Sequence, residues 1–468
     1  MIEELLCNKD STLFGALEMI NNNSKGTVFI IDNNKLCGVL TDGDIRRLLL
    51  SGYKLQEKIA NVIGGEFVYA YNTETYEQVL SKLKNSIKII PLVNKDFEVV
   101  DYVYYDKDVH VPVADLDLRG NEFKYLIDAF LTTWISSQGP YVEMFEKNFA
   151  KFCGCEHAVT TSSGTVALHL ALLALGIGKG DEVIVPDLTF VATINAALYT
   201  GATPVIVDVE EESWCIDPKE IEKAITGKTK AVIPVHLYGQ PCDMSAIMAI
   251  AKKHKIFVVE DCAEAHGATF DGKYVGSFGQ IGCFSFYGNK VITTGEGGMC
   301  VTDDPVLHKK MVLLKNHGMS QERKYWHDVV GYNYRMTNLQ AAIGVAQLEK
   351  ISEFLRNRAE VEEKYKKLLL DIPFVEFQRD DLPKRKKITW LVSILVNENR
   401  RDSIISKLKD KGMDTRPFFY PLSVMDIYKQ YAARPCQKSK DIAARGMNLP
   451  TVYNKKFEET VNMIRESF

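Results

Sequence analysis

The chain lacks the features that would place it in a membrane or outside the cell. No apolar run reaches the ~18 residues of a membrane-spanning helix, and the closest candidate, 166–178, contains His169. The first residues carry neither the basic nor the apolar region of a signal peptide. A net charge of -4 gives no basis for binding nucleic acid or an anionic membrane. We therefore expect a cytoplasmic protein without membrane or nucleic-acid partners.

The cysteines lack a metal-binding pattern. Cys153 and Cys155 are close in sequence, but no second pair follows at the spacing of metal ligands. We expect reduced thiols and no metal site. With 46% apolar and 25% charged residues, the composition is that of a globular protein. A chain of 468 residues is too long for one hydrophobic core, so two or three domains are expected.

Residues 1–107 form a self-contained segment with an internal repeat of helices and strands. Each half is too small to bury a core of its own. The predicted elements are a helix at 11–22, strands at 27–31 and 35–40 and a helix at 42–50, followed by a helix at 73–83 and strands at 87–93 and 98–104. A polar linker is expected near 107–112.

The turn at 38–47 reads Gly-Val-Leu-Thr-Asp-Gly-Asp-Ile-Arg-Arg and resembles the signature of CBS domains. The resemblance implies a tandem CBS module that binds an adenine nucleotide, with Thr41 and Asp44 at its phosphate and ribose. The second repeat has no matching Thr-x-x-Asp, which leaves at most one such site. Thr41 is equally a helix N-cap, with Asp44 as an acid favoured in the first turn, so a merely structural module stays open.

The rest of the chain alternates apolar strands with helices. The predicted strands are 158–161, 182–186, 203–208, 229–235 and 255–260. Such an α/β pattern favours a mostly parallel sheet covered on both faces, with ligands at the carboxyl ends of the strands. A long helix over 338–370, a strand at 389–396 and a helix at 401–411 predict a smaller α+β domain that closes over the site. We expect a large domain at 111–350 and a small one at 351–468.

Three features of the large domain together predict a pyridoxal 5'-phosphate (PLP) site. Ser163-Gly-Thr165 feeds a helix N-terminus, which favours a phosphate. Asp261 ends a strand, and Lys290 lies in an apolar, aromatic run where burial lowers the pKa of its amine. PLP needs a phosphate anchor, an acid at its ring nitrogen and a Schiff-base lysine. Phe190 is the candidate for stacking on the ring. Each feature alone is more often a helix cap or a surface lysine.

From about residue 111 onward, the chain resembles the DegT/DnrJ/EryC1/StrS family of sugar aminotransferases, which have the fold-type I PLP aminotransferase architecture. The segments that carry the resemblance are Trp134-Ile-Ser-Ser-Gln-Gly139, Thr161-Ser-Ser-Gly-Thr-Val-Ala-Leu-His169, Val235-His-Leu-Tyr-Gly239, Glu260-Asp-Cys-Ala-Glu-Ala-His-Gly267, 284–298 and Gly331-Tyr-Asn-Tyr-Arg-Met-Thr-Asn338.

The resemblance implies roles for single residues. Lys290 would be the Schiff-base lysine and the acid/base, and Asp261 would pair with the ring nitrogen. Asn333 would reach the cofactor phosphate of the neighbouring subunit, which implies a homodimer with shared sites. The other implied contacts are Gly164, Thr165 and Ser285 at the phosphate, Glu264 near the ring hydroxyl, and His317, His327 and Arg416 in the substrate cleft. The last three are equally ordinary polar loop residues.

Within the family, segments 284–298 and 416–421 look most like those of perosamine synthases. Those enzymes aminate C4 of GDP-4-keto-6-deoxymannose with L-glutamate, for a lipopolysaccharide O-antigen or another surface polysaccharide. A family branch with histidine in place of Lys290 dehydrates its sugar instead. Three alternatives stay open. The first is the same chemistry on another keto substrate: a UDP- or dTDP-linked sugar, a sugar aminated at C3 rather than C4, or a smaller keto compound. The others are a PLP enzyme that does not transaminate and a nucleotide-sensing regulator with a secondary PLP domain.

Overall fold

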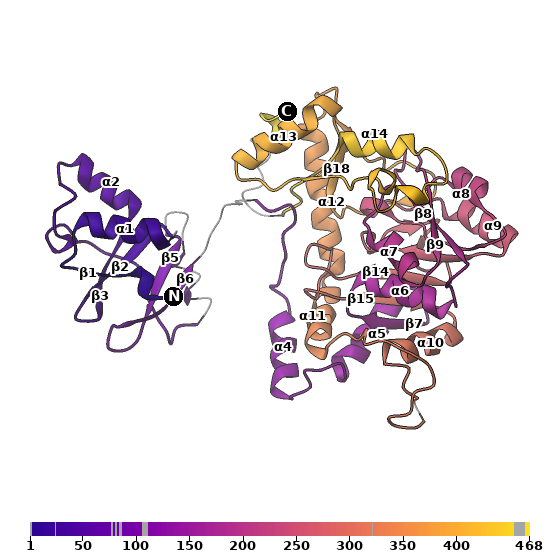
Figure 1. The fold of residues 1–468 in the computed structure, drawn as a ribbon, viewed down its shortest axis with the longest axis horizontal. Helices are drawn as coiled ribbons and strands as arrows, with labels where there is room; N and C mark the ends of the chain where they lie inside the picture. Colours follow the sequence, from indigo (N-terminus) through magenta and orange to yellow (C-terminus); the bar gives the residue numbers. More distant parts are fainter. Residues whose placement is uncertain are drawn as a thin grey trace. The chain divides into compact units, whose positions relative to one another are not determined.

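The computed structural model describes residues 2–23, 25–75, 78–79, 82–83, 87–104, 111–320, 322–453 and 464–468. The chain forms two compact units, Met1–Asp108 and Val109–Phe468 (Figure 1). Most of the predicted linker at 107–112 lies outside the described residues. The described contacts keep 109–468 as one unit, and its division into a large and a small domain near residue 350 stays a prediction.

The described residues of the first unit form two three-stranded sheets, ordered β1-β2-β3 and β4-β5-β6. Leu13, Val28 and Ile45 are buried in the core that the helices form with the first sheet. Part of the helix predicted at 73–83 lies outside the described residues. The elements are η1 (Ile2–Leu5), β1 (Leu6–Asn8), α1 (Leu13–Asn23), β2 (Thr27–Asp32), β3 (Lys35–Thr41), α2 (Asp42–Leu50), η2 (Ile59–Asn61), β4 (Ala70–Tyr71), β5 (Ile89–Val93) and β6 (Val99–Tyr104).

The second unit is built on a seven-stranded sheet in the order β7-β15-β14-β11-β10-β8-β9. Only β15 runs antiparallel to its neighbours among these strands, so the predicted mostly parallel sheet is confirmed. The strands are β7 (His157–Thr161), β8 (Glu182–Pro186), β9 (Thr203–Val207), β10 (Thr229–Val232), β11 (Phe257–Asp261), β14 (Ile281–Ser285) and β15 (Gly298–Thr302).

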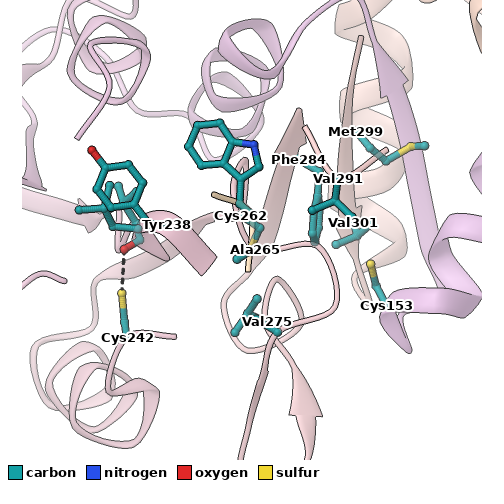
Figure 2. Close-up of a cluster of buried hydrophobic side chains, with 14 of the residues drawn as sticks. Cys153, Tyr238, Cys242, Cys262, Ala265, Val275, Phe284, Val291, Met299 and Val301 are labelled. Carbon is teal, nitrogen blue, oxygen red and sulfur yellow. Dashed lines mark hydrogen bonds between the residues drawn. The ribbon is translucent and has the colours of Figure 1, made fainter. Parts of the chain in front are cut away.

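Helices cover both faces of this sheet, because its strands are apolar on both sides. Val258 and Phe284 belong to one hydrophobic core, whereas Val259 and Cys283, next to them in sequence, belong to the other. Figure 2 shows part of the first core, where Phe284, Met299 and Val301 lie near Cys153. The helices are α4 (Glu122–Leu131), α5 (Pro140–Cys153), α6 (Gly164–Ala174), α7 (Ala192–Tyr199), α8 (Pro218–Ala224), α9 (Met244–His254) and α10 (Pro305–Lys315).

The C-terminal part adds a four-stranded sheet ordered β16-β18-β20-β19, with its own apolar core. A further small sheet, β13-β12-β17, joins it to the larger part of the unit. The remaining elements are η3 (Leu237–Gly239), β12 (Thr269–Phe270), β13 (Lys273–Tyr274), β16 (Glu376–Phe377), β17 (Arg385–Lys386), β18 (Val392–Leu395), α13 (Glu398–Asp410), β19 (Arg416–Pro417), η4 (Leu422–Val424), η5 (Lys429–Tyr431), α14 (Gln437–Arg445) and β20 (Gly446–Leu449).

The single long helix predicted over 338–370 is wrong. The structure has two helices, α11 (Asn338–Glu349) and α12 (Ile351–Leu368), separated by Lys350. Lys350 leaves the helical conformation, with φ -105° and ψ 3°. The break separates two packing environments, since α11 contacts α4 and α5 whereas α12 contacts β18. Apolar spacing continues across Lys350, so the sequence pattern does not reveal the interruption.

One carboxylate fastens the C-terminal part to the large sheet. Asp187, which follows β8, is fully buried. It accepts hydrogen bonds from the Ser423 amide at 2.6 Å, the Ser423 hydroxyl at 2.8 Å and the Ser439 hydroxyl at 2.5 Å. These bonds hold the chain around η4 and the start of α14 against the carboxyl edge of the sheet.

None of the helices in the described part of the chain is both long and apolar enough to cross a membrane. The cytoplasmic location stays a prediction.

Candidate active site

A cavity of about 440 Å³ opens at the carboxyl ends of the sheet strands. Apart from Asn333, every residue predicted to contact the cofactor lines it: Gly164, Thr165, Phe190, Asp261, Glu264, Ser285 and Lys290. These residues come from four different strand-to-helix or strand-to-loop connections. The parallel sheet therefore brings together side chains that are more than a hundred positions apart in the sequence.

Lys290 is 9% exposed. Its Nζ lies 3.4 Å from Oε1 of Glu264 and 3.8 Å from the centroid of the Trp390 ring. Burial lowers the pKa of the Lys290 amine, and the charges of Glu264 and Asp261 oppose that shift. A lowered pKa increases the fraction of neutral amine, which is the form that attacks a carbonyl carbon.

Asp261 is buried and held in a fixed orientation. Its Oδ2 accepts a hydrogen bond from the Thr193 hydroxyl at 2.8 Å, and its Oδ1 accepts one from the Ala263 amide at 3.1 Å. Thr189 in turn lies 2.9 Å from the Thr193 hydroxyl. Burial raises the pKa of Asp261, and the two hydrogen bonds oppose that shift. A carboxylate fixed in this way can pair with a protonated ring nitrogen.

The N-terminus of α6 has the properties of a phosphate site. Ser163 caps the helix by accepting a hydrogen bond from the Val166 amide at 3.3 Å. Within the described chain, the Gly164 and Thr165 amides have no hydrogen-bond acceptor. A Cβ at Gly164 would lie 2.7 Å from Cβ of Ser285, so only glycine lets the helix approach Ser285 this closely. Free amides at a helix N-terminus attract an anion, and these residues therefore fit the phosphate of PLP.

An aromatic wall faces Lys290 and was missed from the sequence. Trp390 donates its Nε1–H to the Asn289 carbonyl at 2.8 Å and stacks on Tyr238 with ring centroids 6.1 Å apart. The Tyr238 amide donates to Oε2 of Glu264 at 2.9 Å, and its hydroxyl accepts from the Phe419 amide at 3.2 Å. Tyr238 lies in the Val235–Gly239 segment that carries the family resemblance, but nothing in the sequence pointed to Trp390.

The predicted substrate residues and Asn333 do not line this cavity. Arg416 pairs with Asp414 at 2.8 Å. The His317 carbonyl lies 2.9 Å from Nδ1 of His327. Asn333 accepts a hydrogen bond from Arg335 at 3.0 Å. Within one subunit these residues contact each other and their neighbours, and their roles at the site stay predictions.

The N-terminal turn that was predicted to bind a nucleotide forms hydrogen bonds within itself. The Thr41 amide and hydroxyl both donate to Oδ2 of Asp44, at 2.9 and 2.6 Å. The Asp44 amide donates to the Thr41 hydroxyl at 3.1 Å, which completes a capping box. Arg47 binds the other Asp44 oxygen at 2.6 Å. Both predicted contact residues therefore already have partners.

His236, Glu260 and Cys262 form a buried cluster beneath the site, with ligand-type atoms within 4.8 Å of one another. His236 Nδ1 accepts a hydrogen bond from the Cys242 amide, so its Nε2 carries the proton and donates to Glu260 at 3.2 Å. Glu260 also accepts hydrogen bonds from three amides of the 276–279 turn. Because His236 and Glu260 already form these hydrogen bonds, neither offers a free metal ligand. The cluster instead stabilises the end of β11.

Comparison with known proteins gives relatives for most of the chain. The sequence profile of the DegT/DnrJ/EryC1/StrS aminotransferase family matches residues 117–467, and that of CBS domains matches residues 1–51. The chain is 48% identical over 354 residues to the GDP-perosamine synthase of Escherichia coli O157:H7, which covers 75% of this chain and 96% of that enzyme.

Solved structures of aminotransferases are similar to this chain in both fold and sequence. An aminotransferase from Psychrobacter cryohalolentis is 32% identical, with a TM-score of 0.71, over 75% of this chain and 97% of that one. A putative sugar aminotransferase of Streptococcus pneumoniae, solved in its PLP form, is 26% identical, with a TM-score of 0.71, over 76% of this chain and 97% of that one.

Proposed function

This chain belongs to the DegT/DnrJ/EryC1/StrS aminotransferase family, and on that premise we propose that it transfers the amino group of L-glutamate to C4 of GDP-4-keto-6-deoxymannose. It is a PLP-dependent sugar aminotransferase, and the proposal concerns its two substrates. The 48% identity to a GDP-perosamine synthase is the observation that carries it. The buried Lys290 amine is the chemical feature that amine transfer requires.

Most of the polar residues of the cavity would bind the cofactor, and Lys290 would transfer protons. When bound, PLP supplies an electron-accepting ring that stabilises negative charge at the carbon that loses its proton. The amides of Gly164 and Thr165 and the Ser285 hydroxyl would hold its phosphate, and Asp261 would pair with its ring nitrogen. Lys290 takes a proton from the α-carbon of the amino donor and returns one to the sugar carbon. Trp390 and Tyr238 exclude water from this amine.

A panel of acceptors tests the substrate assignment. The holoenzyme is incubated with L-glutamate and with GDP-, UDP- and dTDP-linked 4-keto and 3-keto sugars, and 2-oxoglutarate formation is followed. We expect the highest kcat/KM with GDP-4-keto-6-deoxymannose. A higher kcat/KM with a UDP- or dTDP-linked sugar would contradict the proposal and identify that sugar as the preferred acceptor. If glutamate leaves the visible spectrum of the bound cofactor unchanged, glutamate is not the donor.

We also propose a homodimer with shared sites. Helix α4 exposes large apolar side chains, with Phe123 at 72%, Phe130 at 62% and Leu131 at 73% exposure. Asn333 lies outside the cavity of its own subunit, which suits a role in the neighbouring one. Mixing Lys290→Ala and Asn333→Ala subunits would then restore one intact site per mixed dimer. If the mixture stays as inactive as the separate variants, the sites are not shared.

For the N-terminal unit, we propose adenine-nucleotide binding as a second, regulatory activity. The match of residues 1–51 to CBS domains supports it, although Thr41 and Asp44 would have to exchange their present hydrogen bonds for ligand contacts. Calorimetric titration of ATP and AMP into the full chain and into the Thr41→Ala, Asp44→Ala double variant tests it. Binding that the double variant loses supports the proposal, whereas no binding leaves the unit as an assembly element.

A further inference from the structure

A second and larger cavity, of about 720 Å³, lies behind the lysine-bearing segment. Among the described residues, none lines both the active-site cavity and this one. Val291, the neighbour of Lys290, forms part of its wall, together with α12 and the segment 115–119. A cavity of this size can enclose a small organic molecule.

Arg358 of α12 is the unusual group in this cavity. It is 7% exposed, and among the described residues no carboxylate oxygen lies within 4.0 Å of its guanidinium. It donates to the Trp390 carbonyl and, at 3.5 Å, to the Lys290 carbonyl. Its other N–H groups have no protein acceptor in the described part of the chain. Burial lowers the pKa of Arg358 to about 10, so it remains positively charged at neutral pH.

Other cations buried to a similar degree have acidic partners. Lys387, with a side chain 9% exposed, pairs with Glu362 at 2.5 Å. Arg385, with a side chain 8% exposed, pairs with Glu210 at 3.1 Å. A buried charge without a counter-charge is costly, because the protein does not replace the water that the charge has lost. Arg358 is therefore a site where an anion from outside the chain would be strongly favoured.

The acids among the described lining residues of the cavity do not neutralise Arg358. Asp117 is engaged by Arg119 at 2.8 Å and by Lys350 at 3.3 Å. Asp115 acts on Arg358 only as a more distant charge. The remaining walls are partly apolar, since Val291, Phe354 and Val361 contribute to them.

We infer that this cavity binds a small organic anion whose phosphate or carboxylate group pairs with Arg358. The planar guanidinium presents parallel N–H groups that match either anion. Because the same guanidinium holds the carbonyls of Lys290 and Trp390, an anion that draws Arg358 into the cavity weakens the contacts that position the reactive amine. The cavity is thus a regulatory site, and it does not depend on which sugar the enzyme aminates.

Calorimetric titration of the holoenzyme with inorganic phosphate and, separately, with malonate tests binding and distinguishes the two anion types. Arg358→Gln should weaken binding about ten- to hundredfold, as expected for the loss of a charged hydrogen-bonding partner. Asn357 is half-buried in the same cavity, and Asn357→Asp should weaken anion binding by charge repulsion. This second variant keeps the test valid if Arg358→Gln fails to fold. Arg401→Gln is the matched control, since Arg401 also donates to a backbone carbonyl but does not line the cavity.

Transmission to the active site needs a separate measurement. Saturating anion should shift the visible absorbance band of the bound cofactor in the wild type and in Arg401→Gln, but not in Arg358→Gln. If the wild type, Arg358→Gln and Asn357→Asp bind the anion equally well, the anion does not bind in this cavity and the proposal is overturned. Binding that excess GDP abolishes assigns the anion to the sugar-nucleotide site and also overturns it. Binding that leaves the absorbance band unchanged overturns the regulatory role.

Discussion

Helices α2 and α6 both begin with a hydroxyl residue that accepts a backbone N–H bond, but α2 places its own carboxylate at the helix N-terminus, whereas α6 does not. In α2 (the closed turn, 41–44), Asp44 binds back to Thr41 and to Arg47, so the Thr41 and Asp44 side chains are paired within the turn. In α6, Ser163 caps one amide, and the Gly164 and Thr165 amides face a cavity. Both turns resembled anion sites in the sequence.

The difference between the two turns lies in the first three helical residues after the cap. An acid at the third helical position occupies the helix N-terminus with the protein's own negative charge. A glycine at the first position supplies no charge and leaves room for an external one. A hydroxyl residue before a helix is thus weak evidence for a ligand until the next three residues and the space in front of them are known.

The turn before α6 (163–165, the open turn) would hold the phosphate of the cofactor, and Lys290 would be its second attachment point. Removing Lys290 should have the largest effect. Lys290→Ala should lower kcat/KM by at least about 10⁴-fold, the upper end of what one positioned acid–base group contributes. It should also abolish the visible band of the lysine-bound cofactor. Lys315→Ala is the control, since Lys315 is a nearly buried lysine paired with Glu146 outside the site. A fully active Lys290→Ala enzyme would rule out the proposed chemistry.

Filling the open turn should have the next largest effect. Gly164→Ala places a Cβ 2.7 Å from Ser285 Cβ. Overpacking of this kind costs ~1–3 kcal/mol, so cofactor affinity should fall about ten- to hundredfold. Equilibrium dialysis of PLP measures this fall.

The matched change in the closed turn is Gly43→Ala. Its Cβ would meet no atom closer than 3.6 Å. It should leave PLP affinity unchanged and stabilise α2 by ~0.5–1 kcal/mol. Equal loss of PLP in both variants would mean that the steric difference between the turns is irrelevant.

Opening the closed turn should lower the stability of the first unit and leave cofactor affinity unchanged. Asp44→Ala removes the capping box and the bond to Arg47, and should destabilise the first unit by about 1–2 kcal/mol. Hydrogen exchange of the α2 amides reports this change, and PLP affinity serves as the reference that stays constant. Asp42→Ala, which removes only a surface pair with Arg46, should cost less than about 0.5 kcal/mol. The comparison between the turns fails if Asp44→Ala releases the cofactor.

The smallest expected effect is the pH dependence of the two carboxylates. Partial burial opposes ionisation of Asp44, but the bonds from Thr41 and Arg47 outweigh it and lower its pKa below 3.8. Because the unfolded chain then binds more protons, the contribution of Asp44 to stability is present above about pH 4 and is lost as the pH falls through the folded pKa. Hydrogen exchange between about pH 3 and 6 should show this loss in α2, and Asp44→Asn should remove it.

Asp261 should behave in the opposite way in the cofactor-free protein. Burial raises its pKa above 3.8, so the folded state binds more protons than the unfolded one. Its contribution to stability therefore grows as the pH falls through the folded pKa, and Asp261→Asn should remove that trend.

Much of the sheet and the centre of the site could be predicted because they depend on local sequence. Near-continuous apolar runs mark the buried parallel strands. Lys290 was recognisable as a charged residue in an apolar, aromatic segment, and Asp261 as an acid at the end of an apolar strand. Trp390 and Phe419 could not be predicted, since their approach to Lys290 depends on how the C-terminal part folds back over the sheet. The break at Lys350 was missed for the same reason, because it depends on which surfaces the two helices cover.

The hydrogen bonds of Asp187 also set an order for assembly during synthesis. Ser423 and Ser439 lie 236 and 252 positions after it, so these bonds form only when the chain up to these two residues has left the ribosome. By then every strand of the large sheet has been made, while the wall that carries Phe419 has not docked. Long-range contacts of this kind form late and leave apolar surface exposed in the meantime. A chain that stops before residue 423 would keep Lys290 and Phe419 but lose the hydrogen bonds to Asp187 that hold this part against the sheet.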